Sequence, residues 1–124
     1  MSLILIVEDN EKNLKLVRDV LQVKGYETLE AGTAEDGLKI AHERMPNLIL
    51  MDIQLPGMSG IDALKALRAE PATAAIPVVA ITASVMQQDR QQIMSAGFDA
   101  FIEKPINLRG LLDTVQQALK GRKT

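Results

Sequence analysis

The chain alternates short apolar runs with longer stretches in which apolar residues recur at helical spacing. Residues 3–7, 48–51 and 78–81 are apolar throughout. Continuous apolar runs of this length are typical of parallel strands that helices cover on both faces. We therefore expect these three runs to lie in the centre of a sheet. Residues 27–31 and 99–102 are shorter or more polar, which is typical of strands nearer a sheet's edges.

Mostly apolar positions at intervals of three or four residues follow each of the five runs and predict five helices. In chain order these positions are Leu14, Val17, Val20 and Leu21; Leu38, Ala41 and Met45; Ile61, Leu64 and Leu67; Met86, Arg90, Ile93 and Met94; and Leu108, Leu111, Leu112, Val115 and Leu119. Gly25 is placed to end the first helix. The alternation predicts an α/β fold, a (βα)₅ doubly wound five-stranded parallel sheet with the flavodoxin-like strand order 2-1-3-4-5.

The composition agrees with a single domain over residues 1–124, since 47% hydrophobic and 24% charged side chains are near the average for globular domains. Aromatic residues make up only 2% and the formal charge is −2, so direct binding to nucleic acid is not expected. The chain has no cysteine, no signal-peptide pattern and no apolar run near the ~18 residues of a membrane span. We expect a cytoplasmic protein that has no membrane attachment and binds other proteins.

Polar side chains follow four of the predicted strands. Glu8 and Asp9 come directly after the first, Asp52 ends the third, Thr82 ends the fourth, and Lys104 comes just after the fifth. In doubly wound sheets, ligands bind outside the carboxyl ends of the strands. We therefore expect these five side chains to converge on one edge of the sheet.

Three carboxylates in one small pocket repel each other, so one of them would protonate unless a cation is present. Oxygen ligands without His or Cys favour Mg²⁺, Mn²⁺ or Ca²⁺ over Zn²⁺, and Mg²⁺ usually takes one or two carboxylates together with a substrate phosphate. A carboxylate can itself attack phosphorus and form an aspartyl phosphate. The ammonium of Lys104 and the hydroxyl of Thr82 can each then bind a phosphoryl oxygen.

Four sequence segments resemble the signature of bacterial response-regulator receiver domains. They are IVEDN at residues 6–10, LMDIQLPGMSG at 50–60, ITA at 81–83 and KP at 104–105. The segments span nearly the whole chain in the order of that family, each at the carboxyl end of a predicted strand. YETL at 26–29 and MDIQLP at 51–56 further resemble single-domain regulators of the DivK type within the family.

The resemblance implies a role for each matched residue. Asp52 is the expected phosphoacceptor, and Glu8, Asp9, Asp52 and the backbone carbonyl of Gln54 are the expected ligands of Mg²⁺, for which Mn²⁺ can substitute. Thr82 and Lys104 are expected to bind the phosphoryl oxygens. Glu8 stands where the family frequently has aspartate, a common variant with a longer reach.

The resemblance also implies a switch and its partners. Thr82 and Phe101 are the expected switch pair, although Phe101 lacks the hydroxyl of the tyrosine frequent at this position, and the bond before Pro105 is expected to be cis. The phosphoryl donor would be a sensor histidine kinase or a histidine phosphotransfer protein, and the output would be altered affinity for downstream protein partners. The chain is thus expected to be a phosphoacceptor switch that assists its own phosphorylation and dephosphorylation, and not an enzyme.

Other functions of the same fold leave different signatures. A constitutive interaction module would bind partners independently of phosphate, and the intact acidic residues argue against it. A phosphohydrolase with an aspartyl nucleophile generally has a second aspartate two residues later, where this chain has Gln54. A flavin-binding protein needs a phosphate loop after the first strand, where Glu8 and Asp9 would repel the phosphate.

Several smaller features have structural interpretations. Asn10 is the expected cap of the first helix, and Gly57 and Gly60 are interpreted as turn and close-approach positions. Lys12, Lys15 and Arg18 of the first helix form either a docking stripe for an acidic kinase or an ordinary solvated face.

Overall fold

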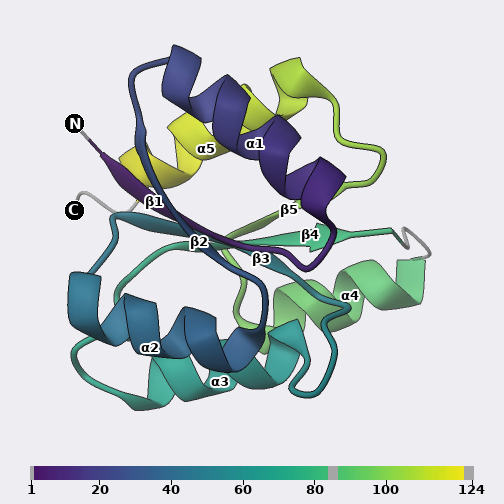
Figure 1. The fold of residues 1–124 in the computed structure, drawn as a ribbon. Coiled ribbons are helices and arrows are strands. Elements are labelled where there is room, and N and C mark those ends of the chain that lie inside the picture. The colour runs from purple at the N-terminus through teal and green to yellow at the C-terminus, as the bar shows by residue number, and fades with distance from the viewer. Residues whose placement is uncertain (1, 84–86, 122–124) are drawn as a thin grey trace.

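The computed structural model describes residues 2–83 and 87–121, the side chains of residues 87–90 and 121 excepted. Strands and helices alternate five times along the chain (Figure 1). The elements are β1 Leu3–Val7, α1 Glu11–Val23, β2 Glu27–Ala31, α2 Ala34–Arg44, β3 Leu48–Asp52, α3 Gly60–Ala69, β4 Val78–Thr82, α4 Gln87–Ala96, β5 Ala100–Glu103 and α5 Leu108–Gly121. This order confirms the predicted (βα)₅ pattern.

The five strands form one parallel sheet in the order β2-β1-β3-β4-β5. The predicted strand order 2-1-3-4-5 is therefore confirmed, with the continuous apolar runs in the middle and the more polar strands at the edges. Every residue of β3 and β4 is buried, whereas β2 has exposed positions. Parallel register brings the carboxyl ends of all the strands to the same edge of the sheet.

Helices cover both faces of the sheet, α1 and α5 on one face and α2, α3 and α4 on the other (Figure 1). Alternate residues of each strand enter the two apolar layers, as the pleat of a strand requires. In β3, Ile49 and Met51 pack in the layer with α2 and α3, while Leu48 and Leu50 pack in the layer with α1 and α5. The sheet is thus fixed between two cores, and its strand ends are held firmly in place.

Local sequence signals account for most helix ends. The Asn10 side chain caps α1 by accepting the backbone N–H groups of Lys12 and Asn13, as expected. Gly25 follows α1 with φ of +90°, a conformation that glycine adopts without a steric cost. Helix α2 ends at Arg44 and does not include Met45, which has a left-handed φ of 49°. The cause is Pro46, because a residue before proline is disfavoured in helical conformation.

Two further details differ from the sequence prediction. Strand β5 begins at Ala100, one residue later than predicted, because the Asp99 side chain accepts the backbone N–H of Val78 in place of a ladder carbonyl. In α4, Ile93 is buried but Met94 is 47% exposed, so the predicted spacing does not mark a continuous buried face. Met86, the first position of that pattern, lies outside the described residues.

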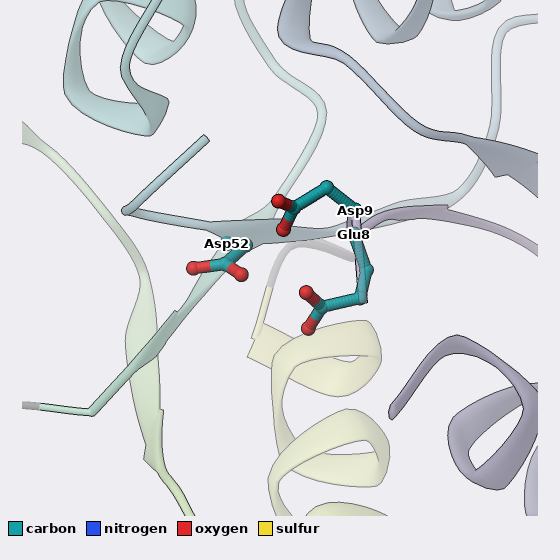
Figure 2. A group of neighbouring side chains, drawn as sticks. All are labelled: Glu8, Asp9 and Asp52. Carbon is teal, nitrogen blue, oxygen red and sulfur yellow. The ribbon is translucent and has the colours of Figure 1, made fainter. Parts of the chain in front are cut away.

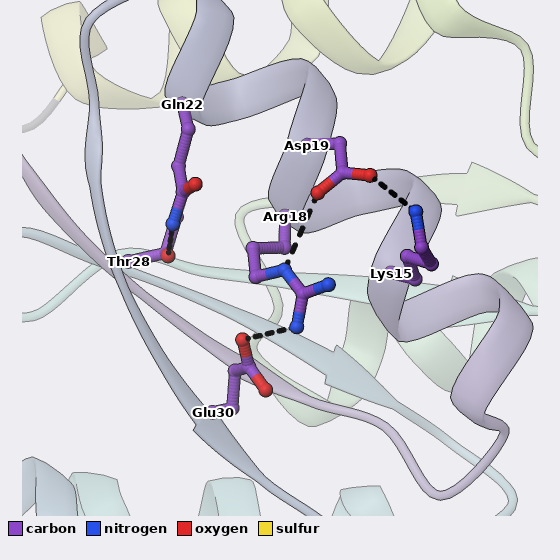
Figure 3. A network of polar contacts seen from close by, with 6 residues as sticks. All are labelled: Lys15, Arg18, Asp19, Gln22, Thr28 and Glu30. Carbon is purple, nitrogen blue, oxygen red and sulfur yellow. Dashed lines mark hydrogen bonds and ion pairs between the residues drawn. The ribbon is translucent and has the colours of Figure 1, made fainter.

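Polar contacts join α1 to the edge strand β2 (Figure 3). Arg18 pairs with Glu30 at 3.1 Å and Gln22 donates to Thr28 at 2.9 Å, while Lys15 pairs with Asp19 on the same helix at 2.9 Å. Two of the three basic residues of α1 therefore already have acidic partners within the domain. This favours the interpretation of the stripe as an ordinary solvated face. Within the described residues, no helix has the length and apolar character needed to span a membrane.

Candidate functional site

The strand ends bring the polar residues singled out in the sequence to one edge of the sheet. Asp52 is the last residue of β3, next to Ile81 of β4, and Thr82 is the last residue of β4, next to Glu103 of β5. Glu8 directly follows β1, and its backbone N–H still donates to the carbonyl of Ala31 in β2 at 3.0 Å. The sheet register thus fixes the backbone of each of these positions.

Glu8, Asp9 and Asp52 form an acidic cluster in which one oxygen from each lies within 4.8 Å of the others. Figure 2 shows the side chains of Glu8 and Asp9, from the end of β1, turned toward Asp52 at the end of β3. Glu8 and Asp52 are only 1% and 2% exposed, whereas Asp9 lies at the open side of the cluster. The cluster is therefore a buried floor with one exposed carboxylate at its rim.

Both carboxylate oxygens of Asp52 have partners. Oδ1 accepts the backbone N–H of Gln54 at 2.9 Å, and Oδ2 lies 2.9 Å from Nζ of Lys104. The same Nζ lies 3.5 Å from Oε1 of Glu8. Burial on its own would lower the pKa of Lys104, but Asp52 and Glu8 outweigh that effect and raise it. Lys104 is thus a firmly charged ammonium placed between two buried acids.

Glu8 differs from Asp52 in how its carboxylate oxygens are hydrogen-bonded. Its Oε2 accepts the backbone N–H of Asn10 at 3.2 Å, while its buried Oε1 has no hydrogen-bond partner among the described residues. Burial, together with the neighbouring carboxylate of Asp52, raises the pKa of Glu8 to about 7. A buried acceptor without a donor is costly, and a cation would satisfy it. The all-oxygen donor set fits a hard divalent ion of the Mg²⁺ type.

The remaining predicted residues flank the cluster. Thr82 is buried, and its backbone carbonyl accepts the N–H of Lys104 at 2.8 Å. The bond between Lys104 and Pro105 is cis, as the resemblance implies. Phe101 is half-buried and packs against the apolar layer with α2 and α3, outside the acidic cluster. Gln54 reaches Asp52 through its N–H, and the role of its carbonyl as a metal ligand stays a prediction.

A close backbone contact secures the end of β3. Gly60 begins α3, and a Cβ atom at this position would collide with the carbonyl oxygen of Asp52 and lie 2.9 Å from Cα of Ile53. The N–H of Gly60 donates to the carbonyl of Ile53 at 3.0 Å. The expectation that Gly60 is a close-approach position is confirmed.

The sequence does not reveal two contacts of the site, in which the backbone N–H groups of Gln54 and Asn10 donate to the carboxylates of Asp52 and Glu8. Every residue except proline carries such a donor, so residue type gives no signal for it. The only available hint was their spacing, since each donor lies two residues after its acceptor, as in an Asx-type turn.

Comparisons with known proteins identify the family to which the chain belongs. A family model described as the response regulator receiver domain matches residues 4–116. The chain belongs to this receiver-domain family. The receiver domain is 42% identical over 116 residues to the polar-differentiation response regulator DivK of Brucella ovis, an alignment that covers 94% of each chain. DivK of Brucella melitensis is similar to the same extent.

Solved structures resemble the receiver domain over almost its full length. A CheY-like receiver domain from Methanospirillum hungatei has a TM-score of 0.88 and 33% identity, covering 99% of this chain and 97% of its own. The receiver domain of a sensor histidine kinase from Pseudomonas aeruginosa has a TM-score of 0.89 and 28% identity, covering 96% and 98%. In that structure a magnesium ion is coordinated in the active site cleft. The family resemblance and the fold expected from the sequence are thus both confirmed.

Proposed function

We propose that this receiver domain is a phosphorylation-dependent switch of a two-component or phosphorelay system, with Asp52 as its phosphoacceptor. The observation that carries the proposal is the position of Asp52, which is buried at the end of β3, paired with Lys104 at 2.9 Å and grouped with Glu8 and Asp9. The donor would be a phosphohistidine on a sensor histidine kinase or a histidine phosphotransfer protein in the cytoplasm. The output would be a changed affinity for downstream protein partners.

Mg²⁺ is the metal proposed for the acidic cluster. Glu8, Asp9 and Asp52 would hold it together with the backbone carbonyl of Gln54, and Mn²⁺ could substitute. Support comes from Oε1 of Glu8, which accepts no hydrogen bond from the described residues, and from a donor set made only of oxygen. When bound, the ion neutralises negative charge on the phosphoryl oxygens during transfer.

The transfer itself requires positioning more than covalent help. A carboxylate oxygen of Asp52 forms a bond to phosphorus as the bond from phosphorus to the histidine nitrogen breaks, and the electron pair of that bond stays on the imidazole. Lys104 already lies within hydrogen-bond distance of the attacking carboxylate, so its ammonium is in place for a phosphoryl oxygen. The N–H of Gln54 keeps the carboxylate oriented.

The negative charge of the phosphoryl group on Asp52 would drive the conformational switch. A phosphoryl group adds roughly −1.5 to −2 charges at pH 7, and it can shift the population only through contacts that differ between the two states. Thr82 and Lys104 are the groups proposed to make those contacts, with Phe101 as the residue that responds. Thr82 is buried and its backbone carbonyl accepts the N–H of Lys104, so the two residues lie side by side where β4 and β5 end.

The test is phosphoryl uptake from acetyl phosphate with and without Mg²⁺, followed by intact mass. The wild type is expected to gain one phosphoryl group only with Mg²⁺, and Asp52→Asn is expected to gain none while keeping its fold by circular dichroism. Asp9→Asn, at the exposed rim of the cluster, serves as a comparison and should be slowed through weaker Mg²⁺ binding. Uptake by Asp52→Asn equal to that of the wild type would contradict the assignment.

The alternative function is a constitutive interaction module. Measurements of partner binding with and without phosphorylation distinguish it from a switch. If the domain is a switch, its affinity for a partner should change on phosphorylation and stay unchanged in Asp52→Asn treated in the same way. A folded wild type that takes up no phosphoryl group, from acetyl phosphate or from a phosphohistidine donor, would favour the module.

A further inference from the structure

A second cluster of polar contacts lies at the edge of the sheet opposite the acidic cluster, around Arg68 near the end of α3. Its guanidinium donates to the backbone carbonyls of Ala74 and Ile76 at 3.1 and 2.6 Å. It also donates to the carbonyl of Gly97 at 3.2 Å and to Oδ2 of Asp99 at 3.0 Å. A single side chain thus ties α3 to the loop before β4 and to the turn between α4 and β5.

Asp99 extends this cluster into the sheet. Its Oδ2 accepts the backbone N–H of Val78 at 2.8 Å, and its own N–H donates to the carbonyl of Val78 at 2.9 Å. The side chains of Arg68 and Asp99 are 21% and 22% exposed. Ion pairs that are partly buried are screened less than pairs on the open surface, and hydrogen bonds to charged groups are the stronger kind.

Helix α4 is held by contacts close to this cluster. Among its described side chains Ile93 is buried, while Gln91, Gln92 and Met94 are exposed. Phe98, directly after the helix, is 3% exposed and packs in the same layer as Ile93. The buried apolar contacts of this region therefore lie beside the hydrogen bond from Arg68 to the end of the helix. The N-terminal end of α4 is Gln87, which comes five residues after Thr82 in the sequence.

We propose that Arg68 and Asp99 anchor the C-terminal end of α4 and the start of β5 in both states of the switch. A displacement that begins at Thr82 would then turn α4 about this anchored end. The direction of movement rests on the proposed function of Asp52 and Thr82, whereas the anchor itself needs no phosphorylation. The two parts can therefore be tested separately.

The first test is amide hydrogen exchange of the unphosphorylated protein in Arg68→Gln and Lys65→Gln. Lys65 is an exposed cation of the same helix, so its variant is matched for the loss of charge. The amides of Val78 and Asp99 are expected to exchange about tenfold faster in Arg68→Gln than in the wild type, because the ion pair that holds the Asp99 carboxylate in place is lost. Lys65→Gln should leave them unchanged, and equal exchange in all three proteins would overturn the anchor.

A second variant covers the case in which Arg68→Gln lowers stability throughout, which would show as faster exchange of Leu5 and Ile49 as well. Asp99→Asn keeps an oxygen that can accept the N–H of Val78 but removes the ion pair. Its faster exchange is expected to be confined to residues 97–99. Exchange indistinguishable from the wild type there would contradict the role given to the ion pair.

The second test follows amide chemical shifts after Mg²⁺ and acetyl phosphate are added. In the wild type, the amides of Gly97 and Asp99 are expected to shift less than that of Ala83, next to Thr82, and in Arg68→Gln they should shift along with it. Wild-type shifts at Gly97 as large as those at Ala83 would overturn the fixed end. A wild type that takes up no phosphoryl group would contradict the proposed function only. The conclusion from hydrogen exchange about the anchor would not change.

Discussion

At the scale of single residues, Glu8 shows how burial turns an ordinary carboxylate into a sensitive group. Its buried Oε1 accepts no hydrogen bond from the part of the chain that the structure describes, and its pKa is raised to about 7 by burial and by Asp52. Lys104 offsets this only in part, from 3.5 Å. The carboxylate is therefore poised between a proton and a cation, and the two compete for it.

Mg²⁺ affinity should accordingly depend on pH. Below about pH 7 a proton must leave Glu8 before the metal binds, so the apparent affinity is expected to fall about tenfold for each pH unit. Calorimetric titration with MgCl₂ on both sides of this value would measure the change. Glu8→Gln should bind more weakly but with a much flatter pH dependence. An identical pH dependence in the two proteins would place the proton on another group.

At the scale of elements, the sequence predicted what depends on local pattern. The continuous apolar runs identified β1, β3 and β4 as central strands, and helix spacing identified α1, α3 and α5. Two of the errors fall where another residue overrides the pattern, and the first is Met45, which Pro46 keeps out of α2. In the same way, the side chain of Asp99 takes the place of a backbone acceptor and delays the start of β5.

The packing of α3 against the end of β3 gives a test at this scale. Gly60→Ala is expected to destabilise the domain by about 1–3 kcal/mol, because its Cβ would meet the backbone of Asp52 and Ile53, which cannot rotate away. Gly32→Ala is the matched control, since a Cβ there meets nothing within 4 Å. Urea unfolding would compare the two, and equal stabilities would show that the end of β3 moves easily.

At the scale of the whole molecule, the convergence of the site could be predicted because parallel strands share one carboxyl edge. Glu8, Asp52 and Thr82 are separated along the chain but occupy equivalent strand ends. The cluster around Arg68 could not be predicted in this way, because three of its contacts are to backbone carbonyls in two separate turns. Such contacts depend on the path of the chain, which residue types alone do not give.

The stability of the whole domain should reflect the acidic cluster. The pKa of Glu8 is higher in the folded state than the ordinary 4.5, so its contribution to metal-free stability is full below about pH 4.5 and lost as the pH rises through about 7. Mg²⁺ should reverse this loss above pH 7, by about 2.7 kcal/mol at a hundredfold excess over its Kd. Thermal unfolding of the wild type and Glu8→Gln, with and without Mg²⁺, isolates the effect. The same pH trend in both proteins would contradict it.

Strand β4 joins the two polar clusters, with Val78 at one end and Thr82 at the other. Its five residues set the two ends roughly 13 Å apart at about 3.3 Å per residue. Positions this distant that share no partner usually contribute additively. Substitutions near Thr82 can therefore alter the phosphoryl chemistry, and substitutions near Val78 can alter how α4 is anchored, as separate traits. A protein engineer could likewise retune the lifetime of the signal without redesigning the part that transmits it.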